Sequence, residues 1–125
     1  MIIEINFNSE EALYQQICHQ IILGIASSRL KDGDALPSVR SMADEIGINM
    51  HTVNKAYSIL RQQGYLQVDR RRGVIVSLSA DKYAAMQELS AELQVTLAKA
   101  RCSHISREEV YELVDMIYDS WERMD

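Results

Sequence analysis

Cysteine and histidine are scarce in this sequence of 125 residues, and their positions exclude two classes of protein. Cys18 and Cys102 are too few for a disulfide framework and lack the paired spacing of a structural zinc site. The histidines, His19, His51 and His104, are scattered along the chain. We therefore expect reduced thiols, no metal site and no cofactor.

Long apolar runs and catalytic patterns are missing as well. No stretch approaches the ~20 apolar residues that a membrane-spanning helix needs, and the opening stretch MIIEINFNSE is acidic rather than signal-like. We find no nucleophile paired with a base, no carboxylate dyad and no glycine loop that would cradle a phosphate. These absences predict a cytoplasmic protein that is not an enzyme and has no membrane partner.

The net charge of −5 is spread unevenly along the chain. Residues 38–78 hold six cations and three anions, a balance of +3, whereas residues 79–125 hold five cations and ten anions, a balance of −5. A basic middle segment followed by an acidic tail predicts that the middle faces an anionic partner and that the tail points away from it.

The most informative stretch runs from residue 36 to residue 76. A small residue (Ala43), a glycine (Gly47) and a β-branched residue (Val53) fall where a helix-turn-helix requires them. Ala43 lets two helices approach closely, and Gly47 can end the first helix in a left-handed conformation. Pro37 and Ser38 are typical of the start of that helix, and Asn49 is typical of the cap of the next. The positions expected to pack these helices are Met42, Ile46, Ile48, Val53, Ala56, Ile59 and Leu60.

A short hairpin is predicted directly after these helices. Two β-prone runs, residues 65–69 and 74–78, are separated by Arg70, Arg71, Arg72 and Gly73. Glycine permits a positive φ at the turn, and adjacent arginines on a short loop repel one another unless an anion is near. A helix-turn-helix followed by such a hairpin is a winged helix, whose wing would lie along the phosphate backbone or the minor groove of DNA.

Helices are predicted on both sides of this unit. Asn8 and Glu11 resemble a capping box, and the apolar residues that follow recur every four positions, which predicts a helix over residues 9–28 after a weak strand over residues 2–5. After the wing, one helix is predicted over residues 81–101, a break over residues 102–105, and a last helix capped by Ser106 and Glu109. The expected fold is mainly α with a small β-hairpin: a winged helix-turn-helix domain over residues 1–78 and a two-helix hairpin over residues 79–125.

The two C-terminal helices present a broad apolar face but have too little core of their own. This surface needs a partner, and a second copy of the same chain is the most economical one. A twofold dimer would place two recognition helices about one DNA turn, roughly 34 Å, apart. The alternative is that these helices pack back on their own winged helix. The residues predicted to form the dimer interface are Met86, Leu89, Leu93, Leu97, Val110, Leu113, Val114, Ile117 and Trp121.

Polar side chains without a role in the core predict the contacts with DNA. Asparagine can read adenine with two hydrogen bonds, threonine can bond a phosphate or a base, and lysine adds charge. Arg40 lies in the first turn of its helix, where it opposes the helix dipole, so a DNA contact explains it better than a structural role. We expect phosphate contacts from Arg40, Lys55 and the wing arginines, and base contacts from Asn49, His51, Thr52 and Asn54. The full set of candidate DNA-binding residues is Ser38, Arg40, Asn49, Met50, His51, Thr52, Asn54, Lys55, Arg70, Arg71, Arg72 and Gly73.

The segments LPSVRSMADEIGINMHTVNKAY and QQGYLQVDRRRGVIV resemble the DNA-binding domain of the GntR superfamily of bacterial transcription regulators. The similarity covers residues 10–78, and the short tail resembles that of the YtrA-like subgroup, whose members lack a large effector domain and dimerise through such a tail. The resemblance implies a dimeric repressor that binds an inverted-repeat operator in double-stranded DNA. Because genes of this subgroup often lie beside those of ABC transporters, it also implies control of a neighbouring operon.

The same resemblance assigns roles by motif. Arg40 matches the second-helix arginine that touches DNA, and Arg72 with Gly73 matches the wing tip. The groove-reading positions correspond to Asn49, His51, Thr52 and Asn54. Met50 and Asn54 depart from the family: arginine is frequent at both positions in other branches, and proline is frequent at the first in this subgroup.

Two further possibilities stay open at this level. The winged helix could be a protein-interaction module that does not bind DNA, although a protein-binding wing would carry apolar residues rather than RRRG. A small effector of unknown identity could bind at the junction of wing and tail, or between subunits, and shift the spacing of the recognition helices.

Overall fold

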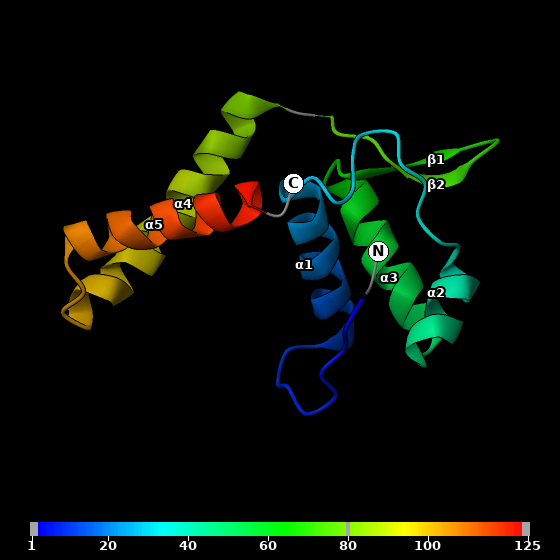
Figure 1. Cartoon of the computed structure of the whole chain (residues 1–125), viewed down its shortest axis with the longest axis horizontal. Coiled ribbons are helices and arrows are strands. Elements are labelled where there is room, and N and C mark those ends of the chain that lie inside the picture. The colour runs from blue at the N-terminus through cyan, green and yellow to red at the C-terminus, as the bar shows by residue number, and fades with distance from the viewer. Residues whose placement is uncertain (1–2, 80, 124–125) are drawn as a thin grey trace. The chain divides into compact units, whose positions relative to one another are not determined.

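The computed structural model describes residues 3–79 and 81–123. Its elements, in order, are α1 (Leu13–Ala26), α2 (Val39–Ile46), α3 (Met50–Gln62), β1 (Leu66–Asp69), β2 (Gly73–Val76), α4 (Lys82–Cys102) and α5 (Arg107–Glu122). The predicted fold is confirmed, since a winged helix-turn-helix is followed by two C-terminal helices (Figure 1). The chain separates into two compact units that part after Ser79. Within the described ranges, none of the helices is long and apolar enough to cross a membrane.

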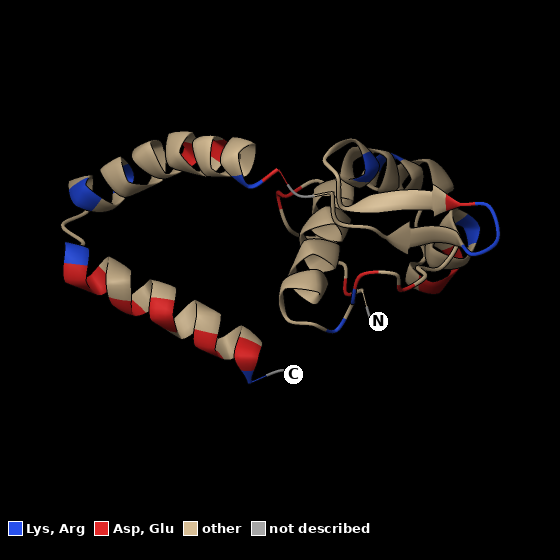
Figure 2. Ribbon diagram, turned by 90° about the horizontal axis from the view of Figure 1, so that it is seen from above, with Lys and Arg blue, Asp and Glu red and all other residues tan. Residues whose placement is uncertain are grey.

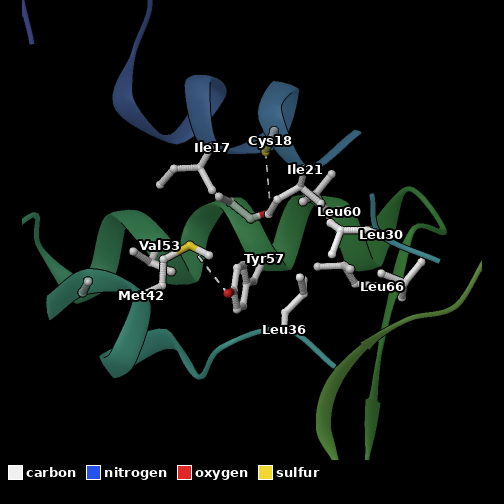
Figure 3. Close-up of a cluster of buried hydrophobic side chains, with 13 residues drawn as sticks. Ile17, Cys18, Ile21, Leu30, Leu36, Met42, Val53, Tyr57, Leu60 and Leu66 are labelled. Atoms are coloured by element: carbon white, nitrogen blue, oxygen red, sulfur yellow. Dashed lines mark hydrogen bonds between the residues drawn. The ribbon is translucent and has the colours of Figure 1, made fainter. Parts of the chain in front are cut away.

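The core of the first unit lies where α1 and α2 pack against α3 (Figure 3). The inner face of α3 is buried, and α1 covers it with Ile17 and Ile21, which are fully buried. Cys18 belongs to the same core, where its thiol donates a hydrogen bond to the carbonyl oxygen of Ala56 at 3.6 Å. Burial raises the pKa of this thiol, so Cys18 acts as a small core residue, whereas Cys102 is exposed. The predicted core positions Met42, Val53, Ala56 and Leu60 are buried, and Ile46, Ile48 and Ile59 pack against them half-buried.

The first helix begins later than the sequence predicted. The capping box of Asn8 and Glu11 is not formed, and α1 begins at Leu13 without a side-chain cap. The buried side chain of Gln16 instead bonds the preceding loop: it accepts a hydrogen bond from the N–H of Asn6 at 2.9 Å and donates to the carbonyl oxygens of Asn6 and Glu11 at 3.0 Å. A glutamine inside the helix therefore holds the preceding loop, which the local pattern did not indicate.

The strand predicted over residues 2–5 is also wrong for the residues that the structure describes. Residues 3–5 form no strand, and Ile2 lies outside the described residues. Glu4 instead exchanges backbone hydrogen bonds with the side-chain amide of Gln20 on α1. Side-chain amides of α1, rather than a sheet, hold the N-terminal segment.

The wing is an antiparallel hairpin in which Asp69 pairs with Gly73 at the tip. Its strands are shorter than predicted, because β1 begins at Leu66 and β2 ends at Val76. Residues 33–36 lie along the other edge of β2, joined to it by backbone hydrogen bonds of 2.7–2.8 Å. Since α2 begins three residues after this segment, the base of the wing and the start of α2 are fixed to each other.

The second unit consists of α4 and α5, joined by an elbow over residues 103–106. The elbow begins one residue later than predicted because α4 continues to Cys102. The predicted capping box of α5 is confirmed: Ser106 and Glu109 exchange hydrogen bonds of 3.1 and 2.9 Å. The two helices diverge from the elbow (Figure 2), and none of their described residues is buried. Their apolar side chains are therefore left exposed.

Candidate nucleic-acid interface

The turn between α2 and α3 is set by capping residues. Ser38 caps α2 by accepting a hydrogen bond from the N–H of Ser41 at 3.1 Å, and Gly47 ends that helix with a φ of 71°. Asn49 caps α3, since its Oδ1 accepts a hydrogen bond from the N–H of His51 at 2.7 Å. With Oδ1 occupied, Asn49 keeps its side-chain NH₂ as a donor for a phosphate or a base acceptor. It is less suited to the two-bond reading of adenine that needs both groups.

The N-terminal half of α3 gathers most of the predicted base-reading side chains. Asn49, Met50, His51 and Asn54 line one surface pocket of about 550 Å³, together with Val39 of α2. These four predicted residues are exposed, so they can be reached by a partner that enters between the two helices. Thr52, which was also predicted to read bases, is half-buried and does not line this pocket.

The C-terminal half of α3 carries two exposed residues that the sequence analysis missed, Arg61 and Gln62. Together with Ser58 on α3 and Gln67 on β1 they line a second pocket, of about 670 Å³, between α3 and the wing. The spacing in the sequence could have identified Arg61. Ser58 and Arg61 follow Asn54 at intervals of four and seven residues, which places all three on one side of a helix. Arg61 thus adds a cation to the exposed face of α3.

Lys55 is placed differently from the groove-facing residues. Its ammonium group lies 4.0 Å from the centroid of the Tyr14 ring on α1. Such a cation–π contact at an exposed site is worth roughly 0.5–1 kcal/mol, so it holds the side chain towards α1. The phosphate contact of Lys55 stays a prediction, one that requires the backbone of the DNA to pass beside α1.

Asp69 organises the tip of the wing. Its Oδ1 accepts hydrogen bonds from the backbone N–H groups of Arg71 and Arg72 at 2.8 and 3.0 Å, and these bonds lower the pKa of the carboxyl group. The guanidinium of Arg72 lies 3.5 Å from the same carboxylate and donates to the carbonyl oxygen of Gly33 at 3.1 Å. Arg72 is therefore tied back to the body of the domain. Among the described residues, no hydrogen bond or ion pair involves the side chains of Arg70 and Arg71, so they are the free cations of the tip. Figure 2 shows this loop in the colour of Lys and Arg.

Gly73 completes this tip with a φ of 78°, so the positive φ predicted for the turn is confirmed. An added Cβ would meet no atom within 4 Å. The reason for glycine is therefore the backbone conformation alone, which costs an L-residue roughly 1–2 kcal/mol.

We expect Asp69→Ala to weaken binding to every DNA sequence by about three- to tenfold, because the wing loses the acceptor that orders its arginines. Asp44→Ala is the matched control, since it removes an exposed carboxylate from α2. On charge alone both variants should bind DNA more tightly, so weaker binding by Asp69→Ala and not by Asp44→Ala would isolate the structural role. DNA titrations of both variants measure this, and equal behaviour of the two would contradict it.

The same carboxylate predicts a pH dependence of the wing. The folded-state pKa of Asp69 is lowered, so its contribution is fully present above the unfolded value, ~3.9. It is lost as the pH falls through the folded value. Amide hydrogen exchange at Arg71 and Arg72 should therefore be slower in the parent than in Asp69→Ala above about pH 5, and the difference should disappear in stronger acid.

Comparison with known proteins agrees with this geometry. Residues 13–76 match the family model described as bacterial regulatory proteins, gntR family. The HTH-type transcriptional repressor YtrA of Bacillus subtilis is 30% identical over 118 residues, which cover 92% of this chain and 91% of that protein. The HTH-type transcriptional regulator YhcF of the same organism is 33% identical over 87 residues, 70% of this chain and 69% of that protein.

Solved structures show the same architecture. A transcriptional antiterminator from Listeria monocytogenes superposes with a TM-score of 0.82 at 27% identity, covering 93% of this chain and 89% of that one. YtrA from Sulfolobus acidocaldarius, described as a GntR-family transcription factor, superposes with a TM-score of 0.62 at 38% identity, covering 77% of this chain and 99% of that one.

Proposed function

Because this chain belongs to the GntR family of bacterial regulatory proteins, and is thus a DNA-binding transcription regulator rather than an enzyme, we propose that it is a dimeric repressor of an inverted-repeat operator. The observation that carries the proposal is the exposed face of α3, which lines one pocket with Val39 of α2 and a second with β1 of the wing. Family membership makes DNA binding the role of the winged helix and decides against a module that binds only proteins.

The contacts follow from exposure and charge. Arg40, Arg70 and Arg71 are exposed cations on α2 and the wing, and they would bind phosphates. His51 and Asn54 would read base edges, because both are exposed and line the pocket beside α2. Ser38 and Gly73 support these contacts by capping a helix and forming a turn, and Met50 would add an apolar contact. Arg72 acts as a positioning residue for the wing.

A second copy of the chain is the proposed partner of the tail. On α4, the exposed residues Met86, Leu89, Leu93 and Leu97 line a shallow groove of about 300 Å³. On α5, Leu113, Val114 and Ile117 are 44–50% exposed. Val110 and Trp121 are half-buried, and the Trp121 ring packs edge-on against Tyr118 with centroids 5.2 Å apart. An apolar surface of this extent on two helices without buried residues of their own favours burial between two chains.

The target is proposed to be the operon next to the protein's own gene, such as one that encodes an ABC transporter. The similarity to a repressor over nearly the whole length of both chains supports the repressor role. The acidic balance of residues 79–125 keeps the tail away from DNA, while the +3 balance of residues 38–78 draws the winged helix to it.

Two variants test which residue contacts phosphate and which reads a base. Arg40→Ala should weaken binding to all sequences and lower the slope of affinity against salt by about one. Asn54→Ala should cost about 1–3 kcal/mol on the operator and relax the preference at one base pair. Arg123→Ala, which removes an exposed arginine from the end of α5, is the control for Arg40→Ala.

The measurement is binding to the DNA directly upstream of the protein's own gene, titrated across salt, with sedimentation to determine mass. Operator binding by both variants at parental strength, at several salt concentrations, would contradict the assigned roles.

A further inference from the structure

We propose that the elbow between α4 and α5 binds a small amphipathic anion, a molecule with one carboxylate or phosphate head on a short apolar body. The elbow holds a pocket of about 730 Å³, lined by residues of both helices and of the connection between them. This volume lies within the ~300–1,000 Å³ of typical small-molecule sites. We call it the elbow pocket. It contains none of the predicted DNA-binding residues, and it borders the apolar groove on α4, with which it shares Leu97.

The cations of the elbow pocket indicate the head group. Arg101 from α4 and Arg107 from α5 both line it. Within the described ranges neither guanidinium forms an ion pair. The nearby Glu109 does not line the pocket, because its carboxylate accepts a hydrogen bond from the N–H of Ser106 at 2.9 Å in the capping box. Two guanidinium groups around one pocket repel each other, and a bound carboxylate or phosphate would relieve this repulsion and match their planar donors.

The apolar lining indicates the body of the ligand. Leu97, Ile105 and Val110 line the same pocket as the two arginines. Water can hydrogen-bond to a guanidinium group, but neither water nor a bare phosphate ion shields these apolar side chains from solvent. A ligand that places its anionic head at the arginines and its hydrocarbon on the apolar residues uses both halves of the lining.

The backbone conformation of His104 is energetically unfavourable for a residue with a side chain, and the fold alone does not explain why histidine stands there. It stands at the end of α4 with a φ of 61°, where its N–H donates to the carbonyl oxygen of Arg101 at 3.1 Å and the N–H of Ile105 donates to that of Ala100 at 3.0 Å. This helix-ending motif favours glycine, because an L-residue is strained in the left-handed conformation. His104 is nevertheless one of the residues that line the elbow pocket, where its imidazole would supply a third nitrogen donor for an anion.

The test uses the full chain and four probes in isothermal titration calorimetry. Octyl phosphate and octanoate carry both features, whereas inorganic phosphate and octanol carry one each. We expect at least one of the two amphiphiles to bind about tenfold or more tightly than either single-feature probe. Preference for octyl phosphate assigns a phosphate ester, and preference for octanoate assigns a carboxylate. The inference is overturned if neither amphiphile binds, or if octanol binds as tightly, because the probe would then sit on the exposed apolar faces.

Three variants locate the site. Arg101→Gln and Arg107→Gln should each weaken binding of the preferred amphiphile by about tenfold, whereas Arg123→Gln, the same change at the end of α5, should leave it unchanged. His104→Gly should raise the unfolding temperature and still weaken binding, which a variant with a damaged fold would not do. Equal binding by the Arg101→Gln, Arg107→Gln and Arg123→Gln variants overturns the inference. All of these residues lie outside the DNA-binding face, so operator titrations of the same samples judge the proposed function separately.

Discussion

Ile117→Asp should convert the proposed dimer into a monomer and lower operator affinity by about 100-fold or more. Ile117 is 47% exposed on the apolar face of α5, and the aspartate would be buried without a partner in the interface between two copies. A monomer engages one half-site at a time and loses the effective concentration that links two half-sites, an effect worth roughly 10²–10⁴ in affinity. Sedimentation equilibrium measures the mass, and a DNA titration measures the affinity.

Two comparisons make this result specific to the interface. Met116→Asp places the same charge one residue earlier on α5, about 100° around the helix, at a residue that is 64% exposed and outside the predicted interface. It should leave the dimer intact. Binding of Ile117→Asp to an isolated half-site should equal that of the parent, since the winged helix is unchanged. An Ile117→Asp variant that stays dimeric with full operator affinity would show that the apolar face of α5 does not join the two copies.

The features that could be predicted from sequence are those whose chemistry is local. Ser38, Asn49 and Ser106 cap helices as expected because a cap needs only an oxygen within a few residues of free N–H groups. Gly47 and Gly73 adopt positive φ because the turns beside them require it. The winged helix and the two C-terminal helices were therefore predictable as elements. The capping box at Asn8 failed because neighbouring side chains bond its N–H groups: Asn6 Oδ1 accepts from Asn8 at 3.0 Å, and Ser9 Oγ accepts from Glu11 at 3.1 Å.

The candidate site was less predictable, because residues far away in the sequence decide whether each cation is paired within the protein or free to bind DNA. In the sequence, Arg72 is one of three adjacent arginines. In the structure its guanidinium donates to the carbonyl oxygen of Gly33, which is 39 residues away. Lys55 was predicted to contact phosphate, but its ammonium group lies against the ring of Tyr14 on another helix. The elbow pocket likewise requires the side chains of two helices to meet across a turn. Local patterns identify which residues are charged, but only the packing shows which charges remain free.

Tyr57→Ala should lower the free energy of unfolding by about 3–5 kcal/mol, which is the usual cost of removing a buried aromatic side chain. Tyr57 is 2% exposed in the core, and its hydroxyl donates to the carbonyl oxygen of Pro37 at 2.8 Å. Burial, followed by the charge of Glu45, raises the pKa of this hydroxyl, so it stays a donor across the accessible pH range. Denaturant unfolding measures the loss, with Tyr83→Ala as control, because Tyr83 is 73% exposed and should change stability by no more than about 0.5 kcal/mol.

Tyr57→Phe separates stability from function at the same residue. It keeps the ring in the core and removes the hydroxyl's bond to Pro37 together with its 3.6 Å contact with Met42 Sδ, which costs about 1–2 kcal/mol. Pro37 precedes the cap of α2, and Arg40 lies in the first turn of that helix, so this bond ties the recognition helix to the segment that aims Arg40. If it positions Arg40, Tyr57→Phe should weaken DNA binding in the parent and have little further effect in Arg40→Ala. Additive losses in the double variant would instead limit Tyr57 to stabilising the core.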